Sequence, residues 1–425
     1  MSRSDIPQLI QFRLEPQDNG LVHLVFDCPD RSMNVFSNKA IHELGEIAEW
    51  LHASSPRGLL VRSGKANGFC AGADLTELGV AYEMIVAARP ADRFDIAFGH
   101  FFPLSHALRR LETAGVPISA AIGGVALGGG CELALAAHHR VLADAPAAML
   151  GLPECQVGLL PGAGGTQRMP RLAGVGTGLE MLLQGRTLAG TDAVEAGVAD
   201  TVVPAGDEVA AAEQWLLSNA AHATQRWDVS GHRPPRHAEY ADEIERHRER
   251  ELDRMLGHEP APLAILDCVE LGLMQPMDGA IRAEMSVFAR LIARPEPRNM
   301  IRTLFLGKQA YEKAARKEAV PASVTAQACE VGALVAEAMS REPGLRQALF
   351  GEPSGARAQG EVGDRLWLEG QEALLGAMQP VMRYARGAVA EMKDQELLQL
   401  DHLVVREGHV PAYLGGISGL ATLAG

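Results

Sequence analysis

Two glutamates, each beside a glycine-rich turn, are the residues of this sequence best suited to chemistry. Glu132 follows the run Gly128-Gly129-Gly130, and Glu154 precedes the run Gly162-Ala163-Gly164-Gly165. Two carboxyl groups can act on one water molecule as general acid and general base. Consecutive glycines let backbone N–H groups approach a ligand, and the first turn of a helix leaves such donors unpaired. The pattern therefore predicts proton transfer beside a site that stabilises a developing oxyanion.

Each of these features has an ordinary structural explanation when it is taken alone. A glutamate in the first turn of a helix is favoured by roughly 0.3–1 kcal/mol through the helix dipole. Glu154 is unremarkable by itself, and glycine runs also occur as plain turns. Their joint occurrence within residues 117–168 is what favours a catalytic site.

Strand-like and helix-like segments alternate around both glutamates. The apolar run 118–122 predicts a short strand that ends at Gly123-Gly124, and the run 131–137 predicts the helix that carries Glu132. Repeated strand–helix units of this kind predict an α/β fold. The other expected elements are a β-hairpin over 9–14 and 21–26, a helix over 41–51, a strand over 58–61, helices over 94–113 and 178–183, a turn over 193–196, a strand over 199–203 and a helix over 208–221.

Three motifs, in this order along the chain, resemble the enoyl-CoA hydratase/isomerase (crotonase) family. They are the turn Ala71-Gly72-Ala73-Asp74, the stretch GGVALGGGCELAL from Gly123, and the stretch GLPECQVGLLPGAGGTQRMPRLAG from Gly151. Their order and spacing over residues 10–205 are far more specific than any single glycine pattern. The resemblance implies a crotonase-type spiral of ββα units, followed here by a mainly helical C-terminal region. It also implies assembly as a homo-oligomer.

The resemblance assigns roles to residues of these motifs. Glu132 and Glu154 would be the catalytic acids, and the backbone N–H groups of Ala73 and Gly129 would form the oxyanion hole. The sequence does not fix which glutamate is the acid and which the base. The implied reaction adds water to 2-trans-enoyl-CoA thioesters to give 3-hydroxyacyl-CoA, as in fatty-acid β-oxidation. The substrate would contact Ala71, Gly72, Asp74, Leu75, Gly128 and Pro153.

Two other functions fit parts of the sequence. A Δ3-Δ2-enoyl-CoA isomerase needs only one well-placed acid, so the presence of both Glu132 and Glu154 favours a hydratase. A scaffold subunit that binds acyl-CoA or docks a thiolase would explain the long helical second half. Such a scaffold would not need two acids beside an oxyanion turn, which again favours the enzyme.

The second half of the chain differs from the first in composition. We expect a crotonase-like hydratase domain over 1–225, a linker with packing helices over 226–318, and a helical C-terminal domain over 319–425. The linker segment resembles the stretch that joins hydratase and dehydrogenase parts in multifunctional fatty-acid oxidation enzymes of the trifunctional α-subunit type. There the corresponding helix covers the acyl pocket, and packing within the C-terminal domain is the alternative. The apolar residues suited to either use are Met285, Phe288, Leu291 and Ile292.

A dehydrogenase half would need a GxGxxG turn between a strand and a helix to hold the dinucleotide. The sequence has no such turn after residue 230. We therefore expect an α-subunit-like chain in which the NAD-binding domain is missing and the last hundred residues are a remnant of the dehydrogenase C-terminal part. No cofactor is expected, since the CoA thioester is the substrate.

Composition limits the remaining possibilities. A chain of 425 residues with 47% hydrophobic content can form two or three domains with a packed core. Its net charge of −14 argues against nucleic acid as a partner. No apolar run approaches the ~20 residues needed to span a membrane, and the six cysteines show no paired spacing. We expect a cytoplasmic protein with free thiols and no metal site.

Overall fold

The computed structural model of the protein describes residues 6–29, 31–66, 68–218, 220–255, 258–342, 344–350 and 372–423. Packing divides the chain into two compact units, which are interleaved along the sequence. The first contains the residues up to Gln156, Leu160–Ile244 and Ala264–Arg290; the second contains Val157–Leu159, Glu245–Leu263 and the residues from Leu291 onward. These units are defined by packing and the expected domains by composition, so the boundaries at 225 and 318 stay predictions.

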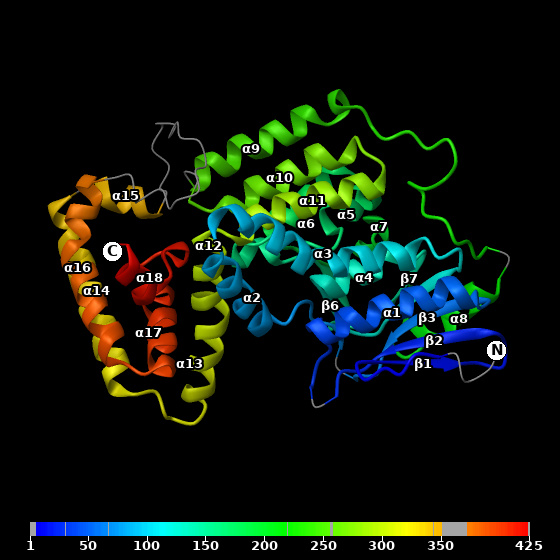
Figure 1. The fold of residues 1–425 in the computed structure, drawn as a ribbon, viewed down its shortest axis with the longest axis horizontal. Coiled ribbons are helices and arrows are strands. Elements are labelled where there is room, and N and C mark those ends of the chain that lie inside the picture. The colour runs from blue at the N-terminus through cyan, green and yellow to red at the C-terminus, as the bar shows by residue number, and fades with distance from the viewer. Residues whose placement is uncertain are drawn as a thin grey trace. The chain divides into compact units, whose positions relative to one another are not determined.

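A six-stranded sheet forms the base of the first unit (Figure 1). Its first two strands form the expected antiparallel hairpin, and every other pair in it is parallel. The strand that reads LVHLVF is buried along its whole length, as expected for a sheet with both faces covered. In spatial order the strands are β1 (Phe12–Pro16), β2 (Leu21–Phe26), β3 (Gly58–Ser63), β5 (Ile118–Ile122), β7 (His139–Asp144) and β10 (Thr201–Pro204).

A second, smaller sheet carries the motif segments of the sequence. Its strands are short, and the first three run parallel while the last is antiparallel to its neighbour. In spatial order they are β4 (Gly68–Cys70), β6 (Val125–Leu127), β8 (Met149–Gly151) and β9 (Thr187–Ala189).

Helices cover these sheets. Helix α8 packs on β3, β5 and β7 through a cluster that includes Leu60, Val141 and Leu216, and α1 packs along α3. Parts of α10 and α11 also belong to the first unit, from Ala264 to Arg290. The helices are α1 (Asn38–Ser54), α2 (Leu75–Ala87), α3 (Arg93–Glu112), α4 (Gly129–Ala136), α5 (Gly165–Ala173), α6 (Val175–Gln184), α7 (Gly190–Glu195), α8 (Glu208–Leu217), α10 (Pro260–Leu273) and α11 (Met277–Ile292).

All of the described secondary structure in the second unit is helical. Helix α17 lies at its centre and packs against α13, α14 and α18, burying Leu400 and Val404 completely. None of the described helices in the chain is long and apolar enough to cross a membrane. The helices of this unit are α9 (Ala241–Met255, mainly from Glu245), α12 (Pro295–Met300), a π-helical turn (Ile301–Leu306), α13 (Gly307–Ala315), α14 (Ala322–Arg341), α15 (Gly344–Phe350), α16 (Glu372–Glu391), α17 (Asp394–Arg406) and α18 (Gly416–Thr422).

The α/β architecture with a mainly helical C-terminal region is as predicted, while several element boundaries differ by a few residues. Strand β1 starts at Phe12 and not at residue 9, because the N–H groups of residues 10 and 11 donate to the carboxylate of Glu43. Helix α8 ends at Leu217 and not at 221, since the N–H and hydroxyl of Ser218 both turn back to the Trp215 carbonyl. Residues 193–195, predicted as a turn, form the end of the short helix α7.

Candidate active site

The three motif segments follow three neighbouring parallel strands. Residues 71–75 follow β4, Gly128 follows β6, and Pro153 with Glu154 follows β8. Ligands of open parallel sheets bind beyond the carboxyl ends of the strands, which meet at one edge. The second sheet therefore brings together the segments that the sequence predicted to form one site.

The backbone of the first two segments approaches closely at this edge. Gly72 has φ +96°, and a Cβ there would lie 3.0 Å from the Leu127 carbonyl oxygen and 3.4 Å from the Gly129 nitrogen. Its own carbonyl accepts the N–H of Phe36 at 2.8 Å. In the described part of the chain, no backbone acceptor takes the N–H of Ala73 or of Gly129. The two expected oxyanion donors thus lie on adjacent backbone segments, and neither has a backbone partner among the described residues.

The glycine run at the start of α4 is required by contacts. A Cβ on Gly130 would lie 2.3 Å from the Cys70 carbonyl oxygen, so only glycine fits. Gly128 has φ +53°, and a Cβ there would lie 2.8 Å from Oε1 of Glu154. The run therefore seats α4 against β4 and leaves room for the second glutamate.

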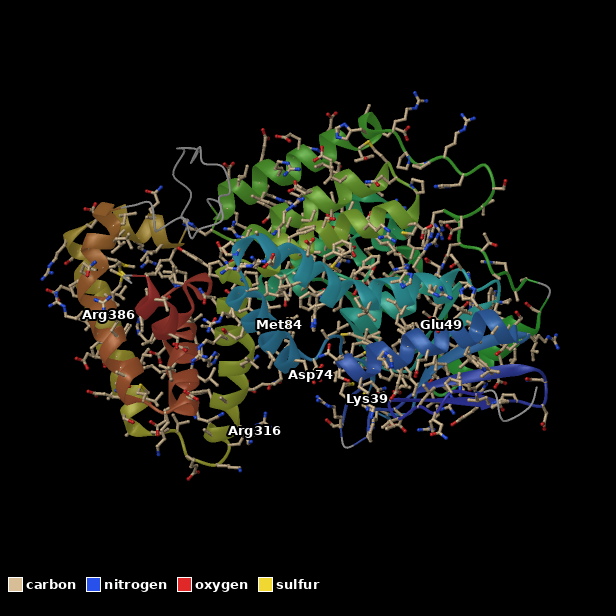
Figure 2. The ribbon with its side chains drawn as sticks, viewed as in Figure 1. Lys39, Glu49, Asp74, Met84, Arg316 and Arg386 are labelled. Atoms are coloured by element: carbon tan, nitrogen blue, oxygen red, sulfur yellow. The ribbon has the colours of Figure 1, made fainter. Side chains whose placement is uncertain are left out.

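The other predicted substrate contacts have structural partners of their own. Asp74, labelled in Figure 2, caps α2 by accepting the N–H of Thr76 at 3.0 Å and pairs with Arg31 at 2.7 Å. Leu75 is the first residue of α2, and the N–H of Ala71 donates to the Asn34 carbonyl at 2.9 Å. The Pro153 carbonyl accepts the N–H of Gln156 at 3.0 Å. Their roles toward a substrate stay predictions.

Glu132 lies in the first turn of α4 with 2% of its surface exposed. Its Oε1 accepts the N–H groups of Ala163 and Gly165, each at 2.7 Å. Burial raises the pKa of Glu132 to about 7, against the opposing effect of these two hydrogen bonds and of Arg168. A carboxyl group that titrates near neutral pH is suited to act as a general acid or base.

Glu154 opens a short 3₁₀ turn after β8. Its Oε2 is buried, and within the described residues it has no hydrogen-bond partner. Burial, and then the charge of Glu132, raises its pKa well above the usual range. A buried acceptor without a protein partner, beside a second carboxyl, is a place where a water molecule or a substrate proton can be held.

Sequence reasoning missed a third carboxyl group, that of Glu284 on α11. The residue is fully buried, and its Oε1 accepts the N–H of Gly164 at 2.7 Å. Its Oε2 accepts the N–H of Thr166 at 3.0 Å and the Thr166 hydroxyl as well. Burial, and then the charge of Glu132, raises the pKa of Glu284 to about 8. The available signal was its position three residues after Ile281, on the apolar face of a predicted helix, where a charge is costly unless it is hydrogen-bonded.

Helix α5 is fixed from behind by buried polar contacts. Arg168 and Glu112 form an ion pair with no exposed side-chain surface on either partner. The Gln167 amide donates to the Cys268 carbonyl at 2.8 Å, and Arg171 donates to the Gly272 carbonyl at 3.0 Å. These bonds attach α5 to α3 on one side and to α10 on the other.

The apolar face predicted on α11 is buried. Met285 is fully buried, and the Phe288 ring meets Phe101 edge-on with centroids 5.0 Å apart. A Cβ on Gly162 would lie 3.0 Å from the Phe288 ring, so this part of α11 touches the second glycine turn, residues 162–165. Coverage of an acyl pocket stays a prediction.

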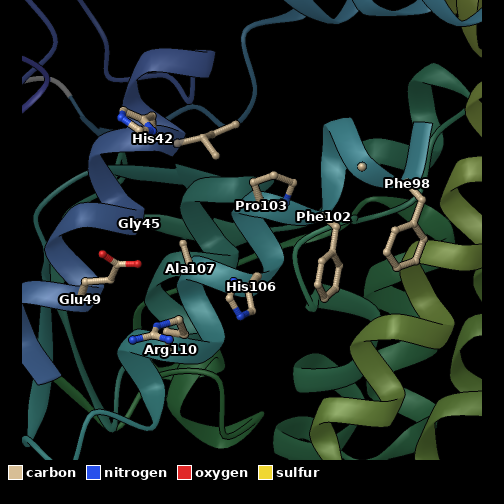
Figure 3. A pocket seen from close by; sticks show the side chains of 11 residues that line it. His42, Gly45, Glu49, Phe98, Phe102, Pro103, His106, Ala107 and Arg110 are labelled. Atoms are coloured by element: carbon tan, nitrogen blue, oxygen red, sulfur yellow. The ribbon is translucent and has the colours of Figure 1, made fainter. Parts of the chain in front are cut away.

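Two surface cavities lie away from these glutamates. One of about 330 Å³ lies between α1 and α3 and is lined by residues that include His42, Glu49, Phe98, Phe102 and Arg110 (Figure 3). The other, of about 390 Å³, lies near the start of β7 and includes His138, Arg140 and Arg226. None of the predicted site residues lines either cavity. Across the described residues, no cluster of three or more His, Cys, Asp or Glu side chains is arranged to hold a metal ion.

A family comparison covers the segments just described. The family described as Enoyl-CoA hydratase/isomerase matches residues 17–228. This region belongs to the enoyl-CoA hydratase/isomerase family. The family region contains the strands from β2 to β10 and every predicted site residue, whereas Glu284 lies beyond it. The resemblance expected from the three motifs is confirmed.

Similarity to individual proteins extends past the enoyl-CoA hydratase/isomerase region. The chain is 35% identical over 315 residues to the fatty acid oxidation complex subunit alpha of Shewanella amazonensis, covering 71% of this chain and 42% of that protein. It is 35% identical over 317 residues to that of Shewanella frigidimarina, covering 74% of this chain and 43% of that protein. The chain thus spans less than half the length of these curated relatives. A crystal structure of enoyl-CoA hydratase from Bacillus anthracis is 25% identical, with a TM-score of 0.40 over 65% of this chain and 89% of that one.

Proposed function

We propose that this chain is an enoyl-CoA hydratase that adds water to 2-trans-enoyl-CoA thioesters to give 3-hydroxyacyl-CoA, in reactions of the fatty-acid β-oxidation type. The observation that carries the proposal is the pairing of the buried carboxyl group of Glu132 with that of Glu154, whose Oε2 is buried. They lie at the edge where, among the described residues, no backbone acceptor takes the N–H groups of Ala73 and Gly129. The family membership of residues 17–228 supports the same class of chemistry.

The proposed reaction uses each of these groups once. The N–H groups of Ala73 and Gly129 hold the thioester oxygen as it gains negative charge, and loss of one such donor typically costs about 10²–10³ in rate. Water adds to the β-carbon as one carboxyl takes its proton, and the other carboxyl gives a proton to the α-carbon. Acid–base catalysis of this kind is typically worth about 10²–10⁴.

The protonation states suggest an assignment of the two acids. Glu132, with a pKa of about 7, is partly ionised near neutral pH, whereas the pKa of Glu154 is raised well above its usual range. The less acidic group retains its proton, so we assign Glu154 as the donor to the α-carbon and Glu132 as the base that takes the proton from water.

Two further possibilities concern the type of reaction and the assembly of this chain. A Δ3-Δ2-enoyl-CoA isomerase would need one acid only, and the presence of buried Glu132 and of Glu154, with its buried Oε2, at one edge favours the hydratase. The relatives are named as alpha subunits of a complex, which makes assembly with a thiolase-type partner, in addition to a homo-oligomer, a second proposal about this chain. We expect no NAD-dependent oxidation step, because the sequence has no GxGxxG turn after residue 230.

Absorbance at the enoyl thioester band tests the proposal. Purified protein mixed with crotonyl-CoA and with longer 2-trans-enoyl-CoA should lower this absorbance as the double bond is hydrated. Mixing with a 3-enoyl-CoA should leave it unchanged, while an isomerase would raise it. A rise with 3-enoyl-CoA and no loss with crotonyl-CoA would contradict the hydratase.

A further inference from the structure

Four consecutive backbone N–H groups, those of residues 163–166, are divided alternately between two glutamates. Glu132 accepts the first and third through Oε1 at 2.7 Å each. Glu284 accepts the second at 2.7 Å and the fourth at 3.0 Å, through different oxygens. The turn that leads into α5 is therefore clamped from both sides, by α4 and by α11.

The two carboxyl groups use their oxygens differently. Both oxygens of Glu284 are occupied, because Oε2 also accepts the Thr166 hydroxyl. Glu132 uses Oε1 alone, and in the described part of the chain no hydrogen bond reaches its Oε2. Glu284 is thus fully used in holding the turn, whereas Glu132 keeps one oxygen for a ligand.

We propose that Glu284 is a positioning residue of the hydratase site: it fixes the turn that holds Glu132 and places a third carboxyl group beside Glu132 and Glu154. This inference rests on the proposed function and adds the linker helix α11 to the site. The charge of Glu284 acts on Glu154, and that of Glu132 acts on Glu284. The ionisable groups that face Glu284 from the surrounding elements are Glu132 on α4, Glu154 after β8, Arg168 and Arg171 on α5, and Cys268 on α10.

Glu284→Gln is the direct test. A glutamine would place its NH₂ group against the N–H of either Gly164 or Thr166, so one side of the clamp is lost in both orientations. Because a negative charge leaves the cluster, the pKa of Glu154 should fall. We expect kcat on crotonyl-CoA to drop about tenfold or more and KM to change by less than about twofold. The limb of the pH–rate profile that reports Glu154 should move to lower pH.

Glu43→Gln is the matched control. Glu43 is also buried in the first unit, and its Oε2 accepts the N–H groups of Gln11 and Phe12 at 2.7 and 3.3 Å. The Glu43→Gln variant should lose stability as Glu284→Gln does, but its kcat and pH profile should equal those of wild type. If Glu284→Gln shows the same pattern as this control, Glu284 is structural only and the proposal is wrong.

A second pair of variants tests the contact between Glu284 and the turn through a smaller change. Thr166→Val removes the hydroxyl that donates to Glu284, and Thr166→Ser keeps it. We expect kcat to fall and the pH profile to change in the valine variant, and both to return in the serine variant. Equal kinetics in the two variants would count against the role of Glu284.

Titration of the carboxyl groups separates this inference from the proposed function. Carboxyl ¹³C NMR of protein labelled at glutamate, assigned with Glu132→Gln and Glu154→Gln, follows both groups without any substrate. A lower Glu154 pKa in Glu284→Gln supports the coupling even if the wild-type chain hydrates no enoyl-CoA, in which case only the proposed function fails. An unchanged pKa would overturn the coupling even in an active hydratase.

Discussion

Arg168 and Glu112 meet through two parallel hydrogen bonds, Nε to Oε1 and Nη2 to Oε2, each 3.0 Å long, with both side chains fully buried. Arg168 also donates to the carbonyl of Ala163 at 2.9 Å. Since the N–H of Ala163 donates to Glu132, the ion pair and Glu132 hold the same residue of the turn. The stability of the turn and the geometry of the site are therefore coupled.

Replacing Arg168 with methionine should destabilise the protein strongly. Removal of one partner of a buried ion pair typically costs about 3–5 kcal/mol. Among the described residues, the Glu112 carboxylate would keep only its bond to Arg109 at 2.9 Å. Arg13→Met, which breaks an exposed pair with Asp27, should cost less than about 1 kcal/mol. Urea unfolding measures both, and similar losses in the two variants would contradict the supporting role of Arg168.

Glu132→Gln and Glu154→Gln should each lower turnover by about two decades or more. The Glu132→Gln variant should stay folded, because a single glutamine Oε1 can still accept both the Ala163 and Gly165 N–H groups. Crotonyl-CoA kinetics and urea unfolding measure the two effects separately. Near-wild-type turnover in either variant would refute the two-acid mechanism.

Gly128→Ala should impair catalysis more than its backbone strain alone would. The new Cβ would lie 2.8 Å from Oε1 of Glu154 and displace that carboxyl, so we expect a loss of about 10² in kcat. Gly174→Ala is the control, since Gly174 also has a positive φ, +81°, but a Cβ there meets nothing within 4 Å. That variant should cost only about 1–3 kcal/mol of stability. Equal activity in both variants would disprove the displacement of Glu154.

The stability of the protein should depend on pH through Glu132. Its pKa rises from 4.5 to about 7 in the folded chain, so the folded state binds the proton more tightly than the unfolded state does. The resulting stabilisation is fully present below the unfolded pKa and is lost as the pH rises through the folded value. The urea midpoint of wild type should therefore exceed that of Glu132→Gln by a margin that shrinks as the pH rises from about 5 to about 8. A constant difference would show that Glu132 does not titrate in this range.

Truncation after residue 260 should give an inactive and poorly soluble protein. It removes Glu284 from the turn and the Phe288 ring from Phe101, and it exposes an apolar surface of the first unit. Light scattering and crotonyl-CoA kinetics test this expectation. A soluble truncated form with unchanged kinetics would show that α10 and α11 are not needed by the site.

Local patterns in the sequence predicted the segments that the second sheet brings together. Residues 118–122 form β5 as expected, and the glycine runs take the turns that only glycine fits, as Gly130 shows against Cys70. These predictions succeeded because periodicity and steric freedom are properties of short stretches of chain.

Contacts between residues far apart in the sequence could not be predicted from local patterns. Glu284 lies 118 positions from Thr166, and nothing in the helical period of α11 indicates which backbone groups a buried glutamate will meet. Likewise, the pKa of Glu132 depends on burial that arises only when the second glycine turn folds over it. Such properties follow from tertiary packing and not from local propensity.

The interleaved first unit has a consequence for how the protein is made. On the ribosome, the turn at Thr166 emerges long before the helix that carries Glu284, because 118 positions separate them. At a synthesis rate of about 5–20 residues per second, the delay is about 6–24 s. Once β10 has emerged within that time, the nascent chain has the strands of both sheets but still lacks the segment Ala264–Arg290 that completes the unit. The newborn polypeptide should therefore be most vulnerable to aggregation, and most in need of a chaperone, in this interval.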